Sequence, residues 1–245
     1  MSHSVSSDRL QAVLFDMDGL IVDTEPIHFA AFREYMGRFG VDLPESVMPE
    51  FIGFSEDENL RDLKAKYRLD EPLEAMVAVR RAIYLELVRT SPIEVFAGFW
   101  EFSAAARERG MKQAVVSSAA AVQVEIVLRR LFEMRPELAP PEAYFDAIVS
   151  GDDVARNKPA PDIYLEGAKR LDVPPALCLA LEDSPPGAQS AAAAGMLVVA
   201  VPNKYTEGLS FPGAQAIVPS LREAFEYLRI LLHYGEDRNA RESAV

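Results

Sequence analysis

The feature that most constrains the fold of this chain is a recurrence of short apolar runs rich in β-branched residues. Runs of this length and composition are typical of buried β-strands. They are Ala12–Phe15, Ala114–Val116, Ala147–Val149, Leu177–Leu181, Leu197–Val201 and Ala216–Val218. Segments with helical periodicity separate most of them: Val122–Phe132, Ile163–Leu171, Gln189–Ala194 and Leu221–Leu232. This alternation predicts an α/β fold in which helices cover both faces of a parallel sheet.

One long stretch, Pro26–Phe96, breaks the alternation because it contains helical patterns alone. The expected helices are about Ile27–Phe39, Glu56–Tyr67 and Pro72–Thr90. We therefore predict a Rossmann-like, doubly wound parallel sheet core with an inserted all-helical domain. The predicted parts are a core of residues 1–23 and 96–235, a helical domain of residues 24–95, and a disordered tail of residues 236–245.

Charge and composition exclude several classes of protein. The chain has 245 residues with 25 Lys and Arg against 38 Asp and Glu, which gives a net charge of −13 and argues against a nucleic-acid partner. The polar amino terminus lacks the apolar core of a signal peptide, and Ala191–Val201 is too short to span a membrane. The single cysteine, Cys178, cannot form an internal disulfide. We expect a cytoplasmic protein without a membrane partner, and we favour a monomer.

Two carboxylates follow the first apolar run, in the order Asp16, Met17, Asp18 and Gly19. Residues i and i+2 of an extended chain point the same way, so both carboxylates can face one cleft. Their proximity favours one ionised and one protonated group, which suits a nucleophile beside a general acid. The alternative is a polar turn that favours aspartate, and the pair alone does not decide between the two.

Three later strands also end in polar residues. Ser117 and Ser118 follow the second strand, Lys158 comes after the third, and Glu182 and Asp183 follow the fourth. Each has an ordinary alternative: a helix N-cap, a solvated loop lysine and an acidic helix start, respectively. In open α/β sheets, however, ligands bind beyond the carboxyl ends of the strands. Four coincidences at four strand ends favour one shared site.

The combined charge of these residues indicates a metal ion. Up to four carboxylates in one cleft would repel each other and any phosphate. One divalent cation and one lysine together make such a cluster tolerable, and the cation can bridge carboxylate and phosphoryl oxygens. Magnesium fits best, because it binds through a few carboxylates and retains waters. The sequence therefore predicts metal-assisted phosphoryl transfer.

The segments FDMDG, VVSSA, NKPAPD and LEDSPPGAQSAAAAGM occur in this order within about residues 10–232. In them the chain strongly resembles the haloacid dehalogenase-like hydrolase superfamily. It looks most similar to the subgroup of β-phosphoglucomutases and small-metabolite phosphatases. Members of this subgroup carry a helical cap between the first and second motifs, which matches the inserted helical segment. We call that segment, residues 24–95, the cap.

The resemblance implies a role for each motif residue. Asp16 would attack phosphorus and become an aspartyl phosphate, while Asp18 would protonate the leaving oxygen and later deprotonate the hydrolytic water. The presence of Asp18 argues against a true dehalogenase, because that branch lacks an acid there. The phosphoryl group would be bound by Gly19, Ser117, Ser118 and Lys158.

The resemblance also implies a Mg²⁺ cofactor. Its ligands would be Asp16, the backbone carbonyl of Asp18 and Asp183. Glu182 would serve as a ligand or as support for the other ligands.

The cap departs from the β-phosphoglucomutase pattern. Where those mutases carry an arginine three residues after a cap-loop glycine, here Gly53 is followed by Glu56. That arginine grips the distal phosphate of the substrate; Arg61 or Arg80 could replace it, although a solvated helix face is the ordinary role of such residues. His28 could reach the cleft or remain an exposed helical histidine. His28, Glu56 and Arg80 are the predicted substrate-binding residues of the cap.

These inferences together predict a Mg²⁺-dependent phosphatase that acts on a small phosphorylated metabolite of the sugar or polyol phosphate class. The nearest alternative is a sugar-phosphate mutase, against which Glu56 weighs. A phosphoaspartate signalling receiver would be about half this length and would lack a cap. A catalytically inactive scaffold would not need the full set of catalytic side chains. The sequence does not identify the substrate.

Overall fold

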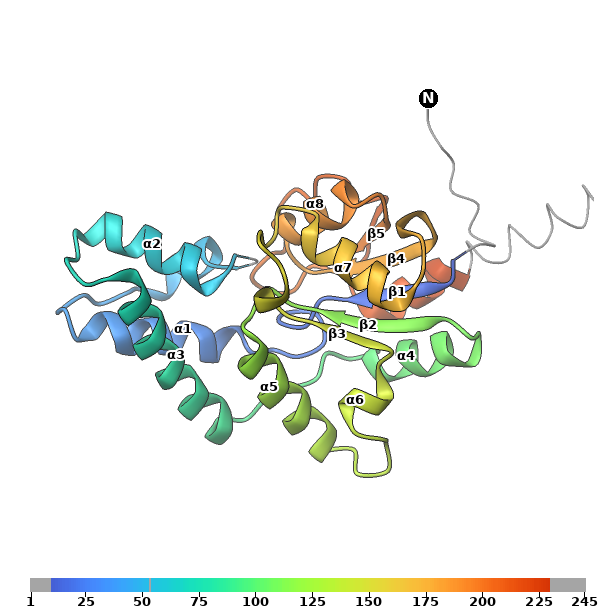
Figure 1. Ribbon diagram of the computed structural model, residues 1–245, viewed down its shortest axis with the longest axis horizontal. Helices are drawn as coiled ribbons and strands as arrows, with labels where there is room; N and C mark the ends of the chain where they lie inside the picture. Colours follow the sequence, from blue (N-terminus) through green and yellow to red (C-terminus); the bar gives the residue numbers. More distant parts are fainter. Residues whose placement is uncertain (1–9, 53, 230–245) are drawn as a thin grey trace, which may run out of the picture.

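A computed structural model describes residues 10–52 and 54–229 of the chain. The core is a parallel sheet of six strands in the order β3-β2-β1-β4-β5-β6, which confirms the predicted doubly wound architecture (Figure 1). The strands are β1 Ala12–Phe15, β2 Lys112–Val116, β3 Ala147–Val149, β4 Cys178–Glu182, β5 Leu197–Ala200 and β6 Ala216–Ile217. The predicted tail, residues 236–245, and the cap-loop Gly53 lie outside the described residues.

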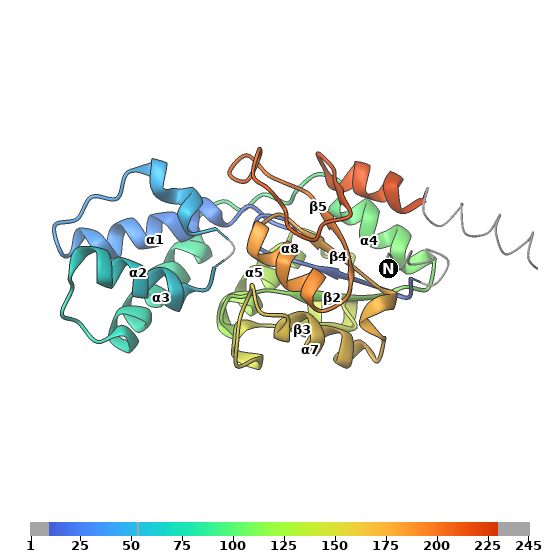
Figure 2. The same cartoon turned by 90° about the horizontal axis from the view of Figure 1, so that it is seen from above.

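Helices cover both faces of this sheet (Figures 1 and 2). The core helices are α4 Phe99–Glu108, α5 Ala121–Glu133, α6 Pro141–Tyr144, α7 Asp162–Leu171 and α8 Pro185–Ala193, and residues 221–229 are also helical. Strand β1 shows why both faces are covered. Val13 and Phe15 pack into the cluster that includes α4 and α5, while Ala12 and Leu14 pack into the cluster under α7 and α8. All four side chains are fully buried, as the period of two in a central strand requires.

Local sequence explains where several of these helices begin. Helix α8 starts four residues earlier than its apolar pattern predicts. The Ser184 hydroxyl accepts a hydrogen bond from the Gly187 N–H, and two prolines occupy the first helical turn. Helix α4 was not predicted, and α6 occupies part of a proline-rich stretch, residues 135–143, that we expected to be a loop.

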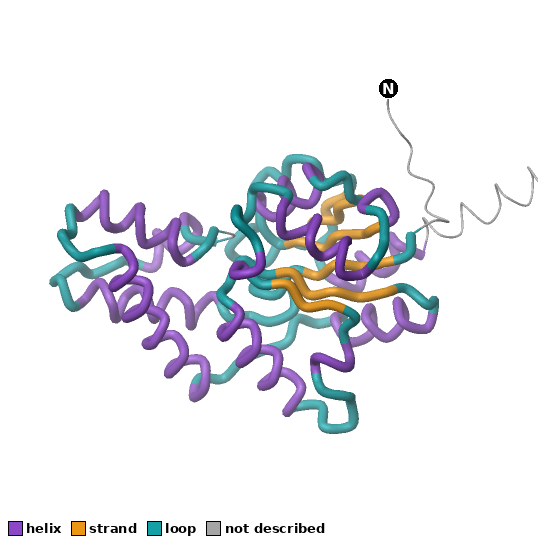
Figure 3. Tube along the Cα trace, in the orientation of Figure 1, coloured by secondary structure: helices purple, strands orange, loops and turns teal. Residues whose placement is uncertain are grey.

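The described residues of the cap, 24–52 and 54–95, form helices and loops and contribute no strand to the main sheet (Figure 3). The helices of the cap are α1 Glu25–Gly37, the 3-10 helix η2 Glu45–Glu50, α2 Glu56–Tyr67 and α3 Leu73–Thr90. Their positions confirm the three predicted helices. Ser55 and Glu58 form a capping box that fixes the start of α2, so Glu56 lies in its first turn.

Two adjacent connections join the cap to the core. The Asp23 N–H donates to the Glu94 carbonyl at 2.8 Å, and the Phe96 N–H donates to the Ile21 carbonyl at 2.9 Å. The two connections therefore run antiparallel beside each other, close to the predicted boundaries at residues 23/24 and 95/96. Those boundaries remain a prediction. Within residues 10–52 and 54–229, every helix is too short or too polar to cross a membrane.

Candidate active site

The two aspartates after β1 have different partners. Asp16 lies at the carboxyl end of β1, and its N–H donates to the Leu181 carbonyl of β4 at 3.1 Å. The Asp18 carboxylate instead accepts hydrogen bonds from the hydroxyls of Thr24 and Ser117, the latter at 3.2 Å. Specific contacts therefore hold the two carboxylates, which a simple polar turn would not require. Each carboxylate has its own set of partners.

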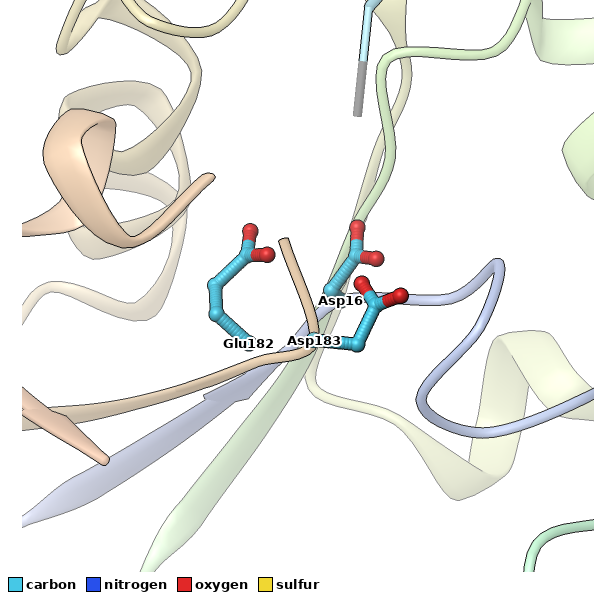
Figure 4. Close-up of side chains that lie close together, drawn as sticks. All are labelled: Asp16, Glu182 and Asp183. Atoms are coloured by element: carbon cyan, nitrogen blue, oxygen red, sulfur yellow. The ribbon is translucent and has the colours of Figure 1, made fainter. Parts of the chain in front are cut away.

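Asp16, Glu182 and Asp183 form a buried carboxylate cluster between β1 and β4 (Figure 4). One oxygen from each lies within 4.8 Å of the others. The Asn203 amide donates to Asp183 Oδ2 at 2.8 Å and to the Gly19 carbonyl at 3.1 Å, which orients the Asp183 carboxylate. An all-oxygen donor set of this kind fits a hard divalent cation such as Mg²⁺.

Only glycine fits at position 19, beside the carboxylate cluster. Its φ of +85° is in the left-handed region, and a Cβ there would lie 2.2 Å from Asp183 Oδ2. Glycine thus allows the turn to approach the Asp183 carboxylate closely. The predicted phosphate-binding role of Gly19 remains a prediction.

Lys158 is a buried, doubly paired lysine and not a solvated loop residue. Its Nζ lies 2.5 Å from Asp16 Oδ1 and 2.7 Å from Glu182 Oε1. Glu182 also accepts hydrogen bonds from the hydroxyls of Tyr164 at 2.5 Å and Ser184 at 3.1 Å. Glu182 is thus fixed on three sides and holds Lys158 against Asp16. This geometry fits the supporting role better than that of a free metal ligand.

The pKa values of the aspartates follow from burial and these contacts. Burial, only partly offset by Lys158, raises the pKa of Asp16 to about 7, and burial with neighbouring carboxylates raises that of Asp183 well above its usual range. Burial also acts to raise the pKa of Asp18, but His28, Thr24 and Ser117 outweigh it and leave that pKa below its ordinary value. Without a metal ion or substrate, Asp16 therefore holds a proton more readily than Asp18. This is the reverse of the expected arrangement, in which the nucleophile is ionised and the general acid is protonated. A divalent cation beside Asp16 would favour its ionised form.

The cap contributes a chain of paired side chains that reaches Asp18. Arg80 is fully buried, and its Nη1 lies 3.0 Å from Glu56 Oε1. Its Nη2 donates to His28 Nδ1 and to the His28 carbonyl, both at 2.9 Å. Arginine can only donate, so His28 carries its proton on Nε2, which lies 3.6 Å from Asp18 Oδ1. Arg80 is thus not a solvated residue, whereas Arg61 is exposed and outside the cleft.

A cleft lies between these cap residues and the core residues. It brings together most of the predicted site: Asp16, Asp18, His28, Glu56, Arg80, Ser117, Ser118 and Lys158. Aromatic residues of the cap, Phe29, Phe32, Phe51 and Phe54, form much of the remaining wall. The Ser118 hydroxyl is buried without a hydrogen-bond partner among the described residues, which leaves it available to a ligand.

Gln123 and Glu25 are among the cleft residues that the sequence did not predict. Gln123 accepts a hydrogen bond from the Ala120 N–H at 3.0 Å, and its buried Nε2 has no partner within the described part of the chain. Glu25 lies in the first turn of α1 and is 9 % exposed. In the sequence, Gln123 has the spacing of a helix-capping residue and Glu25 that of a helix N-terminal acid, so neither pattern indicates a cleft.

The arrangement defines a class of protein. A family model described as haloacid dehalogenase-like hydrolase matches residues 13–201, which run from β1 through the cap to β5 and just beyond. The chain belongs to this family and is an enzyme of the hydrolase type. The resemblance inferred from the four motifs is therefore confirmed.

Individual relatives locate the chain within the family. CbbY from Rhodobacter sphaeroides, solved in complex with xylulose-(1,5)bisphosphate, superposes with a TM-score of 0.77 at 30% identity, over 87% of this chain and 96% of that one. Phosphorylated carbohydrates phosphatase from Thermotoga maritima is 30% identical over 91% of this chain and 98% of its own length. Beta-phosphoglucomutase from Bacillus subtilis is 29% identical, covering 96% and 99%. The predicted subgroup is confirmed.

Proposed function

We propose that this protein is a Mg²⁺-dependent phosphatase that hydrolyses a phosphorylated sugar or polyol through an aspartyl phosphate on Asp16. The observation that carries the proposal is the Asp16–Lys158 pair beside a buried carboxylate cluster, at the floor of a cleft covered by the cap. The Thermotoga relative, named as a phosphatase of phosphorylated carbohydrates, supports the substrate class. The buried free thiol of Cys178 is compatible with the cytoplasmic, monomeric protein that we propose.

The first step is attack by an Asp16 carboxylate oxygen on phosphorus. The new Asp16 O–P bond forms as the ester P–O bond breaks, and the leaving oxygen takes a proton from Asp18. Lys158 neutralises charge on the phosphoryl group, and Ser117 and Ser118 offer hydroxyls to its oxygens. Catalysis is then mainly positioning and electrostatic stabilisation.

The second step returns the enzyme to its starting state. Asp18 takes a proton from water, the water oxygen attacks phosphorus, and the Asp16 O–P bond breaks to release inorganic phosphate. Asp18 must therefore hold a proton during the first step. A phosphoryl anion beside the Asp18 carboxylate raises its proton affinity and supplies that condition.

Asp16, the Asp18 carbonyl and Asp183 are the proposed metal ligands, oriented by Asn203 and supported by Glu182. When bound, Mg²⁺ offsets the negative charge of the carboxylates and of the phosphoryl oxygens. The carboxylate cluster is the observation that supports this assignment.

A sugar-phosphate mutase is the second candidate, because the Bacillus relative with that name covers nearly the whole chain. A mutase must hold a phosphate at each end of a bisphosphate intermediate. Arg80, the buried arginine in the cap, is already paired with Glu56. This pairing favours the phosphatase.

A screen of phosphorylated metabolites for phosphate release tests the proposal. We expect Mg²⁺-dependent release from sugar or polyol phosphates, and EDTA should abolish it. Asp16→Asn should lower kcat by about a thousandfold or more while the fold is retained, because the nucleophile is lost. Near-normal turnover by the folded Asp16→Asn variant would refute the mechanism. Conversion of a hexose 1-phosphate without phosphate release would instead identify a mutase.

A further inference from the structure

Lys158 lies between two buried carboxylates that compete for its ammonium group. The Nζ atom is 2.5 Å from Asp16 Oδ1 and 2.7 Å from Glu182 Oε1, and none of the three side chains is more than 9% exposed. In the proposed reaction the ammonium must also meet the phosphoryl oxygens beside Asp16. Buried charges are little screened, so a stronger attraction to Glu182 would draw the ammonium away from the phosphoryl site. The position of Lys158 therefore depends on how much charge Glu182 presents to it.

A second donor binds the same oxygen of Glu182. The hydroxyl of Tyr164, in the first turn of α7, donates to Glu182 Oε1 at 2.5 Å. Tyr164 is fully buried, so bulk water does not compete for this hydrogen bond. Hydrogen bonds to an ionised acceptor are strong, and two donors on one oxygen share its negative charge. The Tyr164 hydroxyl thus weakens the attraction between Glu182 and Lys158 without removing it.

The other surroundings of Glu182 leave its carboxylate little freedom to rotate. The Ser184 hydroxyl donates to Oε2 at 3.1 Å. At Gly187, in the first turn of α8, an added Cβ would lie 2.0 Å from Oε2 and 2.1 Å from Oε1, so the carboxylate occupies space that a side chain would fill. The charge on Oε1 is therefore divided between Lys158 and Tyr164, the donors that the described residues supply to this oxygen.

The aromatic ring of Tyr164 makes contacts that are independent of its hydroxyl. The ring centroid is 5.4 Å from Lys158 Nζ, which is a cation–π distance. The ring also belongs to the apolar cluster under α7 and α8 that includes Leu14 and Val116. Phenylalanine has the same ring, so Tyr164→Phe removes the hydroxyl alone and should fold.

We infer that Tyr164 is a positioning residue for phosphoryl transfer, which keeps Lys158 at Asp16 by sharing the Glu182 carboxylate with it. The inference rests on the proposed function and adds a residue to its machinery. Tyr164 does not line the cleft, so it acts through Glu182 and Lys158 rather than on the substrate. A sugar-phosphate mutase that used the same aspartyl phosphate would depend on Tyr164 in the same way.

The test is Tyr164→Phe, assayed with a sugar phosphate at saturating Mg²⁺. Without the hydroxyl, Glu182 should draw the ammonium of Lys158 toward itself, and kcat and kcat/KM should fall together by about tenfold. The KM and the Mg²⁺ concentration for half-maximal activity should change by no more than about twofold, because the hydroxyl binds Glu182 and not the proposed metal ligands Asp16 and Asp183. A general loss of structure would instead change all of these quantities.

Tyr144→Phe is the matched control, because it also removes one buried tyrosine hydroxyl from a hydrogen bond. The Tyr144 hydroxyl lies 2.8 Å from Ser103 Oγ, and Tyr144 does not line the cleft. Both variants should lower the urea midpoint of unfolding by similar amounts, but Tyr144→Phe should change kcat by less than about twofold. Equal kcat values in the two variants would overturn the inference. So would a loss in Tyr164→Phe that a higher Mg²⁺ concentration restores, since Tyr164 would then act on the metal site.

Crystal structures of the wild type and of Tyr164→Phe provide a readout that needs no turnover. In the variant, Lys158 Nζ should lie closer to Glu182 and farther from Asp16, and an unchanged position of Nζ would refute the inference. Failure of the proposed function is distinguishable, because the wild-type protein would then release no phosphate from any monoester. In that event the two crystal structures decide the inference.

Discussion

At the scale of single residues, burial changes the chemistry of groups that look ordinary in the sequence. Glu25 follows Thr24 at the start of α1, where an acidic residue normally complements the helix dipole. In the fold, burial and the charges of Asp18, Asp16 and Asp23 raise its pKa from 4.5 to about 8. Glu25 therefore holds a proton near neutral pH, which allows a carboxyl group to remain beside other carboxylates.

This shift predicts a pH-dependent stability. Between pH 4.5 and about 8 the folded protein retains a proton on Glu25 that the unfolded chain releases. The contribution of Glu25 to the free energy of unfolding is complete below this window and decreases as pH rises through it. Glu25→Gln has no such proton and should gain a few kcal/mol over the wild type by about pH 8.5, at about 1.4 kcal/mol per pKa unit.

Urea unfolding in EDTA at about pH 5 and about pH 8.5 measures this difference. Glu34→Gln is the control, because Glu34 is exposed on the same helix. Parallel pH profiles for the wild type and Glu25→Gln would show that Glu25 titrates normally in the folded protein.

At the scale of elements, local sequence patterns were sufficient to predict most of the helices and strands. The apolar runs predicted the six strands, and helical periodicity predicted α1, α2 and α3, because both patterns follow directly from which faces are buried. The motif aspartates and Lys158 were predictable for the same reason: each follows a strand end. Asn203, Gln123 and Glu25 were not, because their roles depend on distant segments that the fold brings together.

The role of the turn after β1 can be tested by comparing two glycines that have the same backbone conformation. Gly19 and Gly195 have nearly equal φ values of +85° and +84°, but an added Cβ would meet Asp183 only at Gly19 and open space at Gly195. Alanine at either position should cost about 1–2 kcal/mol of stability from the left-handed backbone. Only Gly19→Ala should displace the Asp183 carboxylate, raising the Mg²⁺ concentration for half-maximal activity by about tenfold or more. Equal Mg²⁺ requirements in both variants would contradict the assignment of Asp183 as a ligand.

At the scale of the whole molecule, specific polar contacts help to hold the cap in position against the core. Beyond the two antiparallel connections, Arg130 of α5 donates to the Ser91 carbonyl at 2.8 Å and to the Val88 carbonyl, both at the end of cap helix α3. A cation at a helix C-terminus satisfies exposed carbonyls and complements the helix dipole. Arg130 thus anchors the helix that carries Arg80, and through His28 this helix contacts Asp18.

Removing this anchor should separate cap function from core chemistry. Arg130→Met should lose about 1.5–3 kcal/mol of stability, the usual contribution of hydrogen bonds to a charged group. Its kcat/KM for a sugar phosphate should fall by about tenfold, because a displaced cap no longer holds the leaving group, whereas hydrolysis of acetyl phosphate should change by only about twofold. Arg129→Met is the neighbouring control, since Arg129 is exposed and its partners among the described residues are two exposed glutamates. Equal losses on both substrates in Arg130→Met would mean that Arg130 supports the core, and that the cap is held in place by its two connections.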